Sequence, residues 1–330
     1  MANVWRFHEL GGPEVLQLES VSLSSVGIDD VHISVKAIGL NRSDINFRKG
    51  QYIQKAQFPS RFGYEASGIV VSIGANVTHL SPGDEVFVLP VDDLSQEGTS
   101  ADELVINHKY VVHKPSNLSF VEASAVWMQY LTAWGGIIHA AEIKKGDYVL
   151  ITAATSSVGI AAIQLARQVG AIPIATCLGT QWRQLLKDVG AEHVIPTNEV
   201  DLLEELNRIT GEEGLAAAFD AVGGPQVLQI AEALKKFGRL VIHGYLSSEP
   251  TPFPHRLAIR KTLTVQGYLF SEILDSDVLR ERAKSHILQG LATGVLVPNI
   301  DRVFAFEDMR EAQTHLEQQK HFGKVVLSLM

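Results

Sequence analysis

The segment from Asp147 to Ala171 restricts the possible folds of this chain more than any other stretch. It opens with an apolar, β-branched run, Tyr148–Thr152, whose length and composition are typical of a buried parallel strand. A turn of small residues follows, and then a helical pattern whose apolar positions are Ile160, Ile163, Leu165 and Val169. The next strand is predicted at 172–176. Strand, turn, helix and strand within about 30 residues form a βαβ unit of dinucleotide-binding size.

The turn at 153–159 needs small residues because backbone N–H groups at a helix N-terminus must approach an anionic pyrophosphate closely. A bulky side chain at Ser156, Ser157 or Gly159 would hold the phosphate away. The usual fingerprint has three glycines, and only Gly159 is present here. Taken alone, the segment is as compatible with a purely structural βαβ unit as with a dinucleotide site.

The composition describes a globular protein large enough for two domains, with 330 residues, 46% hydrophobic and 20% charged. The formal charge of 28 − 37 = −9 argues against a nucleic-acid partner, because it offers no basic excess. No apolar window suggests a membrane span or a signal core, so a cytoplasmic protein is expected. The single cysteine, Cys177, excludes an intramolecular disulfide and a cysteine-cluster zinc site.

Three regions follow one another along the chain. Residues 1–121 contain short strands separated by Gly-, Pro- and Asp-rich turns, which predicts a compact barrel-like domain. A helical stretch at 120–140, interrupted at Gly135-Gly136, leads into residues 147–271, where strands and helices alternate. Strands are predicted at 148–153, 172–176, 192–195, 216–220, 239–243 and 262–269. This alternation predicts a doubly wound parallel sheet. The last region contains helices at 277–290 and 307–319 and strands at 303–306 and 324–328.

The whole chain resembles the medium-chain dehydrogenase/reductases, and among them the zinc-free quinone oxidoreductase branch. The matching segments occur in the family's order: HELGGPEVL (8–16), NRSDINFRKGQY (41–52), GYEASGIVVSIGANV (63–77), SPGDEV (81–86), AATSSVG (153–159), FDAVGG (219–224) and FGKVVL (322–327). The resemblance implies a Rossmann-type sheet at 122–271 and a GroES-like β-barrel substrate domain formed by 1–121 and 272–330. It also implies a homodimer paired through the edge strand near 262–268.

Zinc-dependent members of this larger family place a cysteine and a Gly-His-Glu as catalytic ligands, where this chain has Asn41 and Gly63-Tyr64-Glu65. Asparagine and tyrosine are poor zinc ligands, so no metal is expected. Asp44 and Glu65 are then expected to hydrogen-bond loops. Without a Lewis acid, hydride addition to a quinone or an activated C=C bond fits better than alcohol oxidation.

NADP(H) is the expected cofactor, because the strand ending at Thr176 is not followed by the acid that usually binds the ribose of NAD. Thr180 and Arg183 are expected to bind a 2′-phosphate. Leu178 departs from the branch, whose relatives carry a basic residue near it, and a surface arginine that only opens a helix is the alternative for Arg183. The resemblance implies further contacts of Asn41, Thr132, Val222, Gly244 and Tyr245 with the nicotinamide. The full set of expected cofactor contacts is Asn41, Thr132, Ser156, Ser157, Val158, Gly159, Thr176, Thr180, Arg183, Val222, Gly244, Tyr245 and Lys324. For Lys324, a solvated lysine at a strand edge is the alternative.

The resemblance makes Tyr52 and Asn41 the candidate catalytic residues, because Tyr52 matches a tyrosine that acts as proton donor in related enoyl reductases. A phenol is a plausible acid, although a pocket wall without a proton role is an equal alternative. The function expected is NADPH-dependent hydride transfer to a small quinone or α,β-unsaturated carbonyl. The alternatives are an enoyl reductase for longer or carrier-bound substrates and a low-turnover NADPH-binding redox sensor.

Overall fold

The computed structural model describes all residues from 1 to 330. The chain forms two compact units, residues 1–128 with 298–330 and residues 129–297. Helix α11 (Asp277–Ala292) belongs to the second unit, where the Trp134 indole donates a hydrogen bond to His286 Nδ1 at 2.8 Å. The division at 121 and 271 into a substrate domain and a cofactor domain stays a prediction.

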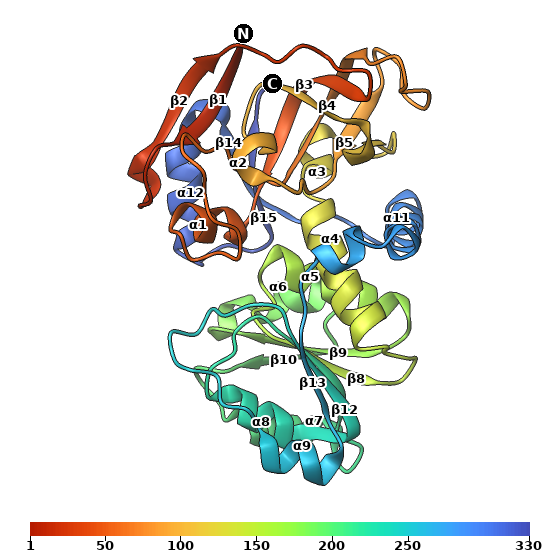
Figure 1. The fold of residues 1–330 in the computed structure, drawn as a ribbon. Coiled ribbons are helices and arrows are strands. Elements are labelled where there is room, and N and C mark those ends of the chain that lie inside the picture. Colours follow the sequence, from red (N-terminus) through yellow and green to blue (C-terminus); the bar gives the residue numbers. More distant parts are fainter. The chain divides into compact units, whose positions relative to one another are not determined.

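The second unit is built on a six-stranded parallel sheet in the order β10-β9-β8-β11-β12-β13, which confirms the predicted doubly wound sheet. Its strands are β8 (Tyr148–Ile151), β9 (Ile172–Cys177), β10 (His193–Pro196), β11 (Leu215–Asp220), β12 (Leu234–Ile242) and β13 (Thr264–Gly267). Its helices are α4 (Trp127–Trp134), α5 (Ser157–Gln168), α6 (Arg183–Asp188), α7 (Leu202–Thr210), α8 (Gln226–Ala233), α9 (His255–Lys261), α10 (Ser271–Leu274) and α11. Helices α5 and α6 cover one face of the sheet and α7, α8 and α9 the other (Figure 1).

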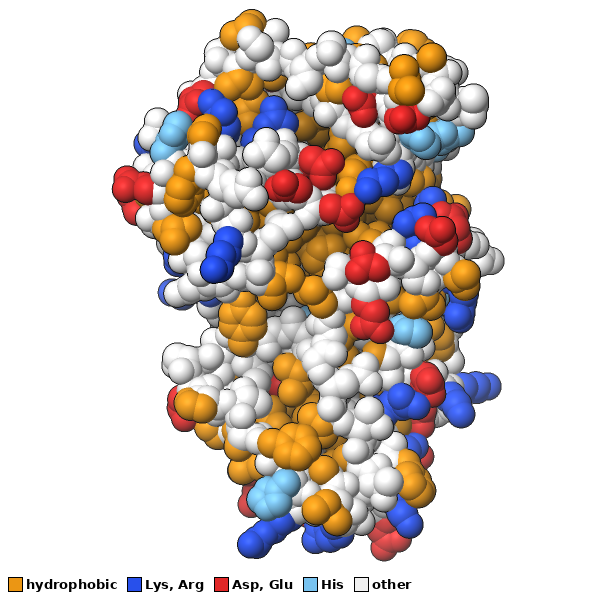
Figure 2. Space-filling model, viewed as in Figure 1, with side chains coloured by type: hydrophobic (Ala, Val, Ile, Leu, Met, Phe, Trp, Pro, Cys, Tyr) orange, Lys and Arg blue, Asp and Glu red, His pale blue; other side chains and the backbone are white.

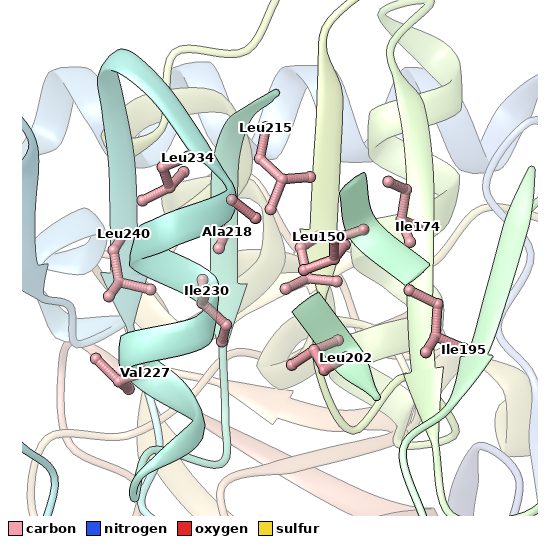
Figure 3. Close-up of a cluster of buried hydrophobic side chains, with 12 residues drawn as sticks. Leu150, Ile174, Ile195, Leu202, Leu215, Ala218, Val227, Ile230, Leu234 and Leu240 are labelled. Carbon is pink, nitrogen blue, oxygen red and sulfur yellow. The ribbon is translucent and has the colours of Figure 1, made fainter. Parts of the chain in front are cut away.

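An aliphatic core joins the sheet to α7 and α8. Leu150 and Ile174 from neighbouring strands are fully buried, as are Leu206 of α7 and Ile230 of α8. Figure 3 labels Leu150 and Ile174 of the strands and Ile230 of α8 among the buried side chains of this cluster. Because both faces of the parallel sheet are covered, its strands are continuous apolar runs, which is why they could be recognised in the sequence.

The predicted break at Gly135-Gly136 is wrong, because α4 continues into a π-helical turn over Gly135–Ala140. A Cβ on Gly135 would lie 1.8 Å from the Tyr268 hydroxyl oxygen, and one on Gly136 would lie 2.0 Å from the Phe219 ring. The two glycines therefore permit a close approach of this helix to the sheet, and they do not end it.

The first unit contains a seven-stranded sheet ordered β14-β15-β3-β4-β5-β7, with β6 paired to β3, and a separate hairpin of β1 and β2. The strands are β1 (Ala2–Phe7), β2 (Leu16–Val21), β3 (Asp30–Leu40), β4 (Glu65–Ile73), β5 (Glu85–Val88), β6 (Glu103–Asn107), β7 (Val111–His113), β14 (Ile300–Ala305) and β15 (Lys324–Ser328). The helices are α1 (Arg42–Arg48), α2 (Leu94–Glu97), α3 (Phe120–Ala123) and α12 (Met309–Glu317). The chain returns to this sheet at its end, since β15 lies between β14 and β3.

Helices α1 and α12 lie side by side in the first unit (Figure 1). Arg48 of α1 is fully buried, pairs with Glu317 of α12 and donates to Gln313 Oε1 at 3.2 Å. Its guanidinium also donates to the carbonyl oxygen of Gly11 at 2.5 Å. These contacts fix α1, and with it the loop that carries Asn41 at the start of the helix.

Candidate functional site

The turn between β8 and α5 contains the residues predicted to bind a phosphate. The Ser156 hydroxyl oxygen caps α5 by accepting a hydrogen bond from the Gly159 N–H at 3.1 Å, and Ser157 and Val158 begin the helix. A Cβ on Gly159 would lie 2.6 Å from Ala154 Cα, so no other residue allows the helix to pack this closely on the turn. The Ser156 hydroxyl hydrogen can still be donated to an anion. The small side chains at the N-terminus of this twelve-residue helix thus fit a dinucleotide pyrophosphate.

The turn is tied to the next strand, because the Ala154 N–H donates to the carbonyl oxygen of Thr176 at 2.9 Å. Since β8, β9, β11 and β12 are parallel, the residues that follow them meet at one edge of the sheet. The structure therefore brings Ser156, Thr176, Val222 and Gly244 to the same edge, where ligands of such sheets bind.

Asp220, which the sequence analysis missed, organises the loop after β11. Its buried carboxylate accepts hydrogen bonds from the Thr152 hydroxyl at 2.6 Å, from Val222 N at 3.0 Å and from Gly223 N at 2.9 Å. Gly223 and Gly224 both have φ near +70°, a conformation that favours glycine. The position of Val222 is thus set by a charge-assisted network. An acid between a buried strand and Gly-Gly was the available signal.

The loop after β12 lies against the loop after β11. A Cβ on Gly244 would lie 2.6 Å from the carbonyl oxygen of Ala221, and Ser247 N donates to the carbonyl oxygen of Val222 at 2.9 Å. The neighbouring Tyr245 side chain is exposed. The loops that carry Val222 and Gly244 are thus held together, and their joint contact with a cofactor stays a prediction.

The segment after β9 is hydrogen-bonded to an acid that comes from the loop after β10. Glu199, from the loop after β10, accepts a hydrogen bond from Thr180 N at 2.9 Å, and Asn198 accepts one from Gly179 N at 2.7 Å. Thr180 and Arg183 are both exposed beside this loop. A carboxylate therefore lies within the region predicted to bind a 2′-phosphate, where it opposes a second negative charge.

In the first unit, the N-terminus of α1 meets a buried ion pair. Lys324 and Glu65, each 1% exposed, form a salt bridge, and Lys324 Nζ donates to Asn41 Oδ1 at 2.6 Å. The other Glu65 oxygen accepts from Met128 N at 3.1 Å. The alternative of a solvated strand-edge lysine is wrong, because β15 is an interior strand and Lys324 is buried. A contact of Lys324 with cofactor phosphate stays a prediction.

Asp44 lies beside this ion pair, and its Oδ2 accepts a hydrogen bond from Asn41 N at 2.8 Å. Its other oxygen is buried without a partner. Burial, partly offset by the hydrogen bond from Asn41, raises the pKa of Asp44 to about 7. The expected loop-supporting roles of Asp44 and Glu65 are confirmed by these bonds.

Tyr52 and Tyr64 form a hydroxyl pair in the same unit. The Tyr64 O–H donates to the Tyr52 oxygen at 2.9 Å, and the two rings meet edge to face with centroids 6.3 Å apart. Tyr64 is buried, and this burial raises its pKa well above the ordinary value for tyrosine. Tyr64 therefore keeps its proton at any physiological pH.

A zinc ion does not fit the residues at this position. Asn41 offers an amide oxygen that is bonded to an ammonium, Tyr64 a protonated phenol, and Glu65 a carboxylate already paired with Lys324. Nowhere in the structure do three or more His, Cys, Asp or Glu side chains gather in an arrangement that could hold a metal. The donor set differs from the thiolates and imidazoles that bind zinc.

The predicted residues thus fall into two sets. Ser156, Ser157, Val158, Gly159, Thr176, Thr180, Arg183, Val222, Gly244, Tyr245 and the buried Thr132 belong to the second unit. Asn41, Tyr52 and Lys324 belong to the first. A common nicotinamide contact of Asn41 and Thr132 stays a prediction, because they belong to different units.

No helix combines the length and apolar character that crossing a bilayer requires. On the face shown in Figure 2, basic and acidic side chains are interspersed without a broad basic surface. This mixture agrees with the acidic net charge and offers no phosphate-binding stripe on that face.

Comparison with known proteins identifies relatives of both units. Residues 27–116 match the alcohol dehydrogenase GroES-like domain, and residues 157–284 match the zinc-binding dehydrogenase family. Quinone oxidoreductase-like protein 2 from Bos taurus is 30% identical over 318 residues, which cover 95% of this chain and 89% of that protein. The match of residues 27–116 confirms the GroES-like character predicted for the substrate domain.

Solved structures show the same fold over the full length. The structure of the Escherichia coli quinone oxidoreductase in complex with NADPH superimposes with a TM-score of 0.90 at 28% identity, covering 99% of this chain and 100% of that one. The CurK enoyl reductase superimposes with a TM-score of 0.88 at 26% identity, covering 99% of both chains.

Proposed function

Because the chain belongs to the quinone oxidoreductase-like branch of the medium-chain dehydrogenase/reductase family, we propose that it is an NADPH-dependent reductase that needs no metal. Its substrate is a quinone or an α,β-unsaturated carbonyl. The observation that carries this proposal is the donor set of the first unit. Where zinc-dependent relatives place metal ligands, this chain has Asn41 and Tyr64, which are bonded to Lys324 and to Tyr52, and a Glu65 already paired with Lys324.

The second unit binds the dinucleotide in this proposal, and the bound reduced nicotinamide supplies the hydride. The N-terminus of α5 with Ser156 and Ser157 holds the pyrophosphate. Thr132, Val222 and Gly244-Tyr245 surround the nicotinamide. Arg183 and Thr180 bind the 2′-phosphate and favour NADPH, while the carboxylate of Glu199 limits that preference.

Tyr52 is the proposed proton donor. Its oxygen accepts a hydrogen bond from Tyr64, and in this proposal its own hydroxyl hydrogen is donated to a substrate oxygen or carbon. Asn41 is oriented on three sides, since its Oδ1 accepts from Lys324 and its Nδ2 donates to the Gly39 carbonyl and to Glu65, both at 3.3 Å. Because both Nδ2 hydrogens are already donated within the protein, Asn41 acts in this proposal by shaping the site and not by donating to a bound carbonyl.

A panel of quinones, enones and 2-alkenals tests the proposal, with oxidation of NADPH followed by its absorbance. We expect turnover with at least one class, and Tyr52→Phe should lower kcat by about 100-fold or more on the same acceptor. Unchanged kcat in this variant would show that Tyr52 only lines the pocket. Stoichiometric zinc in active, purified protein would contradict the metal-free mechanism.

A second candidate is an enoyl reductase for longer or carrier-bound substrates, which the similarity to the CurK enoyl reductase favours. Comparing kcat/KM along a series of 2-enoyl thioesters of rising chain length separates the two functions. A steady rise with length would favour the enoyl reductase, and a preference for small enones or quinones the first proposal. NADPH that binds but is oxidised by no acceptor would indicate a redox sensor.

We also propose that the protein is a cytoplasmic homodimer in which the sheets of two copies join at β13. This strand is the last in its sheet and pairs only with β12 within the chain. Its outer edge therefore has backbone groups available for a second copy. Light scattering of the purified protein should give the mass of two chains, and the mass of one chain would contradict the proposal.

A further inference from the structure

The buried hydroxyl of Tyr64 donates to Tyr52, but no step described so far gives Tyr64 a part in the proton transfer itself. We propose that Tyr64 is a positioning residue for proton transfer, which orients Tyr52 and stabilises its phenolate after the proton has left. This inference rests on the proposed function. It adds a second residue to the proton-transfer step, which the sequence suggested for Tyr52 alone.

The direction of the hydrogen bond is the first argument. Tyr64 O–H is the donor and Tyr52 oxygen the acceptor at 2.9 Å, so the Tyr52 hydroxyl hydrogen is not spent on Tyr64. Edge-to-face packing of the two rings, with an interplanar angle of 71°, limits rotation of both side chains. The Tyr52 oxygen is therefore held beside the Tyr64 hydroxyl, which can donate to it before and after the proton has left.

Burial of Tyr64 is the second argument. Tyr64 is 4% exposed, and burial raises its pKa far above the usual value, with smaller contributions from Tyr52 and from Asp44. Tyr64 thus cannot lose its own proton in the reaction and remains a permanent donor. When Tyr52 becomes a phenolate, the same hydrogen bond becomes charge-assisted, and such bonds are roughly twice as strong as neutral ones.

Hydride addition leaves an electron pair on the substrate carbon or oxygen. The Tyr52 O–H bond breaks, its proton forms the new C–H or O–H bond, and the electron pair stays on the Tyr52 oxygen. Tyr64 keeps its proton and donates to this phenolate, and water then returns a proton to the half-buried Tyr52. One hydride and one proton are added to the substrate in total.

A double-mutant cycle tests the inference. Tyr64→Phe should lower kcat about tenfold, because only the strengthening of one hydrogen bond is lost. Tyr52→Phe/Tyr64→Phe should be no slower than Tyr52→Phe alone, because Tyr64 acts through Tyr52. The solvent deuterium isotope effect on kcat should rise in Tyr64→Phe as proton transfer becomes slower. Tyr110→Phe is the matched control, since Tyr110 is another buried tyrosine of this unit, bonded to Asp92 at 2.6 Å.

A readout without turnover is the tyrosinate difference spectrum between the protein and its Tyr52→Phe variant, which reports ionisation of Tyr52. Its midpoint should move to higher pH by about one unit when Tyr64 is replaced by Phe. Wild-type kcat in Tyr64→Phe together with a slow Tyr52→Phe would overturn the role of Tyr64 and leave the proposed function intact. No turnover with any acceptor in the wild type would overturn both. If the losses of kcat in the two single variants simply added in the double variant, the inference would also be overturned.

Discussion

Removing the ammonium of Lys324 should destabilise the first unit by about 3 kcal/mol. The Lys324→Met variant keeps most of the side-chain length but leaves the carboxylate of Glu65 buried without an opposite charge. Breaking a buried pair from one side costs about 3–5 kcal/mol. The lower end applies here because Glu65 retains hydrogen bonds from Asn41 Nδ2 at 3.3 Å and Met128 N at 3.1 Å.

Urea unfolding, followed by far-ultraviolet circular dichroism, measures the free energy of unfolding of the wild type and the variants. Lys324→Met/Glu65→Gln should recover most of the loss, because the uncompensated charge is gone. Lys109→Met is the control, since Lys109 and Asp92 form an exposed pair that contributes at most about 1 kcal/mol. A loss below about 1 kcal/mol in Lys324→Met, or no recovery in the double variant, would refute the reasoning.

Three further predictions concern the contacts of Arg183, Asp220 and Asp44. Arg183→Ala should raise the dissociation constant of NADPH far more than that of NADH, and Glu199→Gln should lower the dissociation constant of NADPH. Fluorescence titrations measure both constants, and equal changes for the two cofactors would contradict the assignment. Asp220→Asn should lower the free energy of unfolding by about 1–3 kcal/mol and weaken dinucleotide binding, because an amide N–H₂ replaces an oxygen that accepts hydrogen bonds from Thr152 and the loop. An unchanged free energy of unfolding together with unchanged binding would exclude this role. The pKa of Asp44 rises from 3.8 to about 7 on folding, so the folded state binds its proton more tightly and this contribution to stability falls as the pH rises through that interval. Asp44→Asn should therefore gain stability relative to the wild type between about pH 4 and 7, and a constant difference in denaturation midpoints would contradict this.

The elements of the second unit could be predicted because each carries a local signal. Strands such as Tyr148–Ile151 are continuous apolar runs, and the small residues at 153–159 mark the turn after the first of them. The alternation of strands and helices then implied parallel pairing, which the sheet order confirms. The hairpin of β1 and β2 was not predicted, although the structure pairs Ala2–Phe7 with Leu16–Val21.

The contacts of the candidate site could not be read in the same way, because they join distant segments. Lys324 lies 283 residues from Asn41 and 259 residues from Glu65, so no local pattern distinguishes its burial from solvation. Glu199 reaches Thr180 from the loop after another strand. The sequence does supply the residue types, but tertiary packing decides which of them meet.

The interior position of β15 has a consequence for the order in which the chain can fold. The second unit is continuous, from 129 to 297, and its contacts can form as soon as that segment has been synthesised. The first unit must wait, because β15 inserts between β14 and β3 and carries the cation that neutralises Glu65. Until β15 has left the ribosome, Glu65 lacks its opposite charge and residues 37–40 of β3 lack their neighbouring strand. The first unit therefore depends on β15 for stability and for protection from strand exchange.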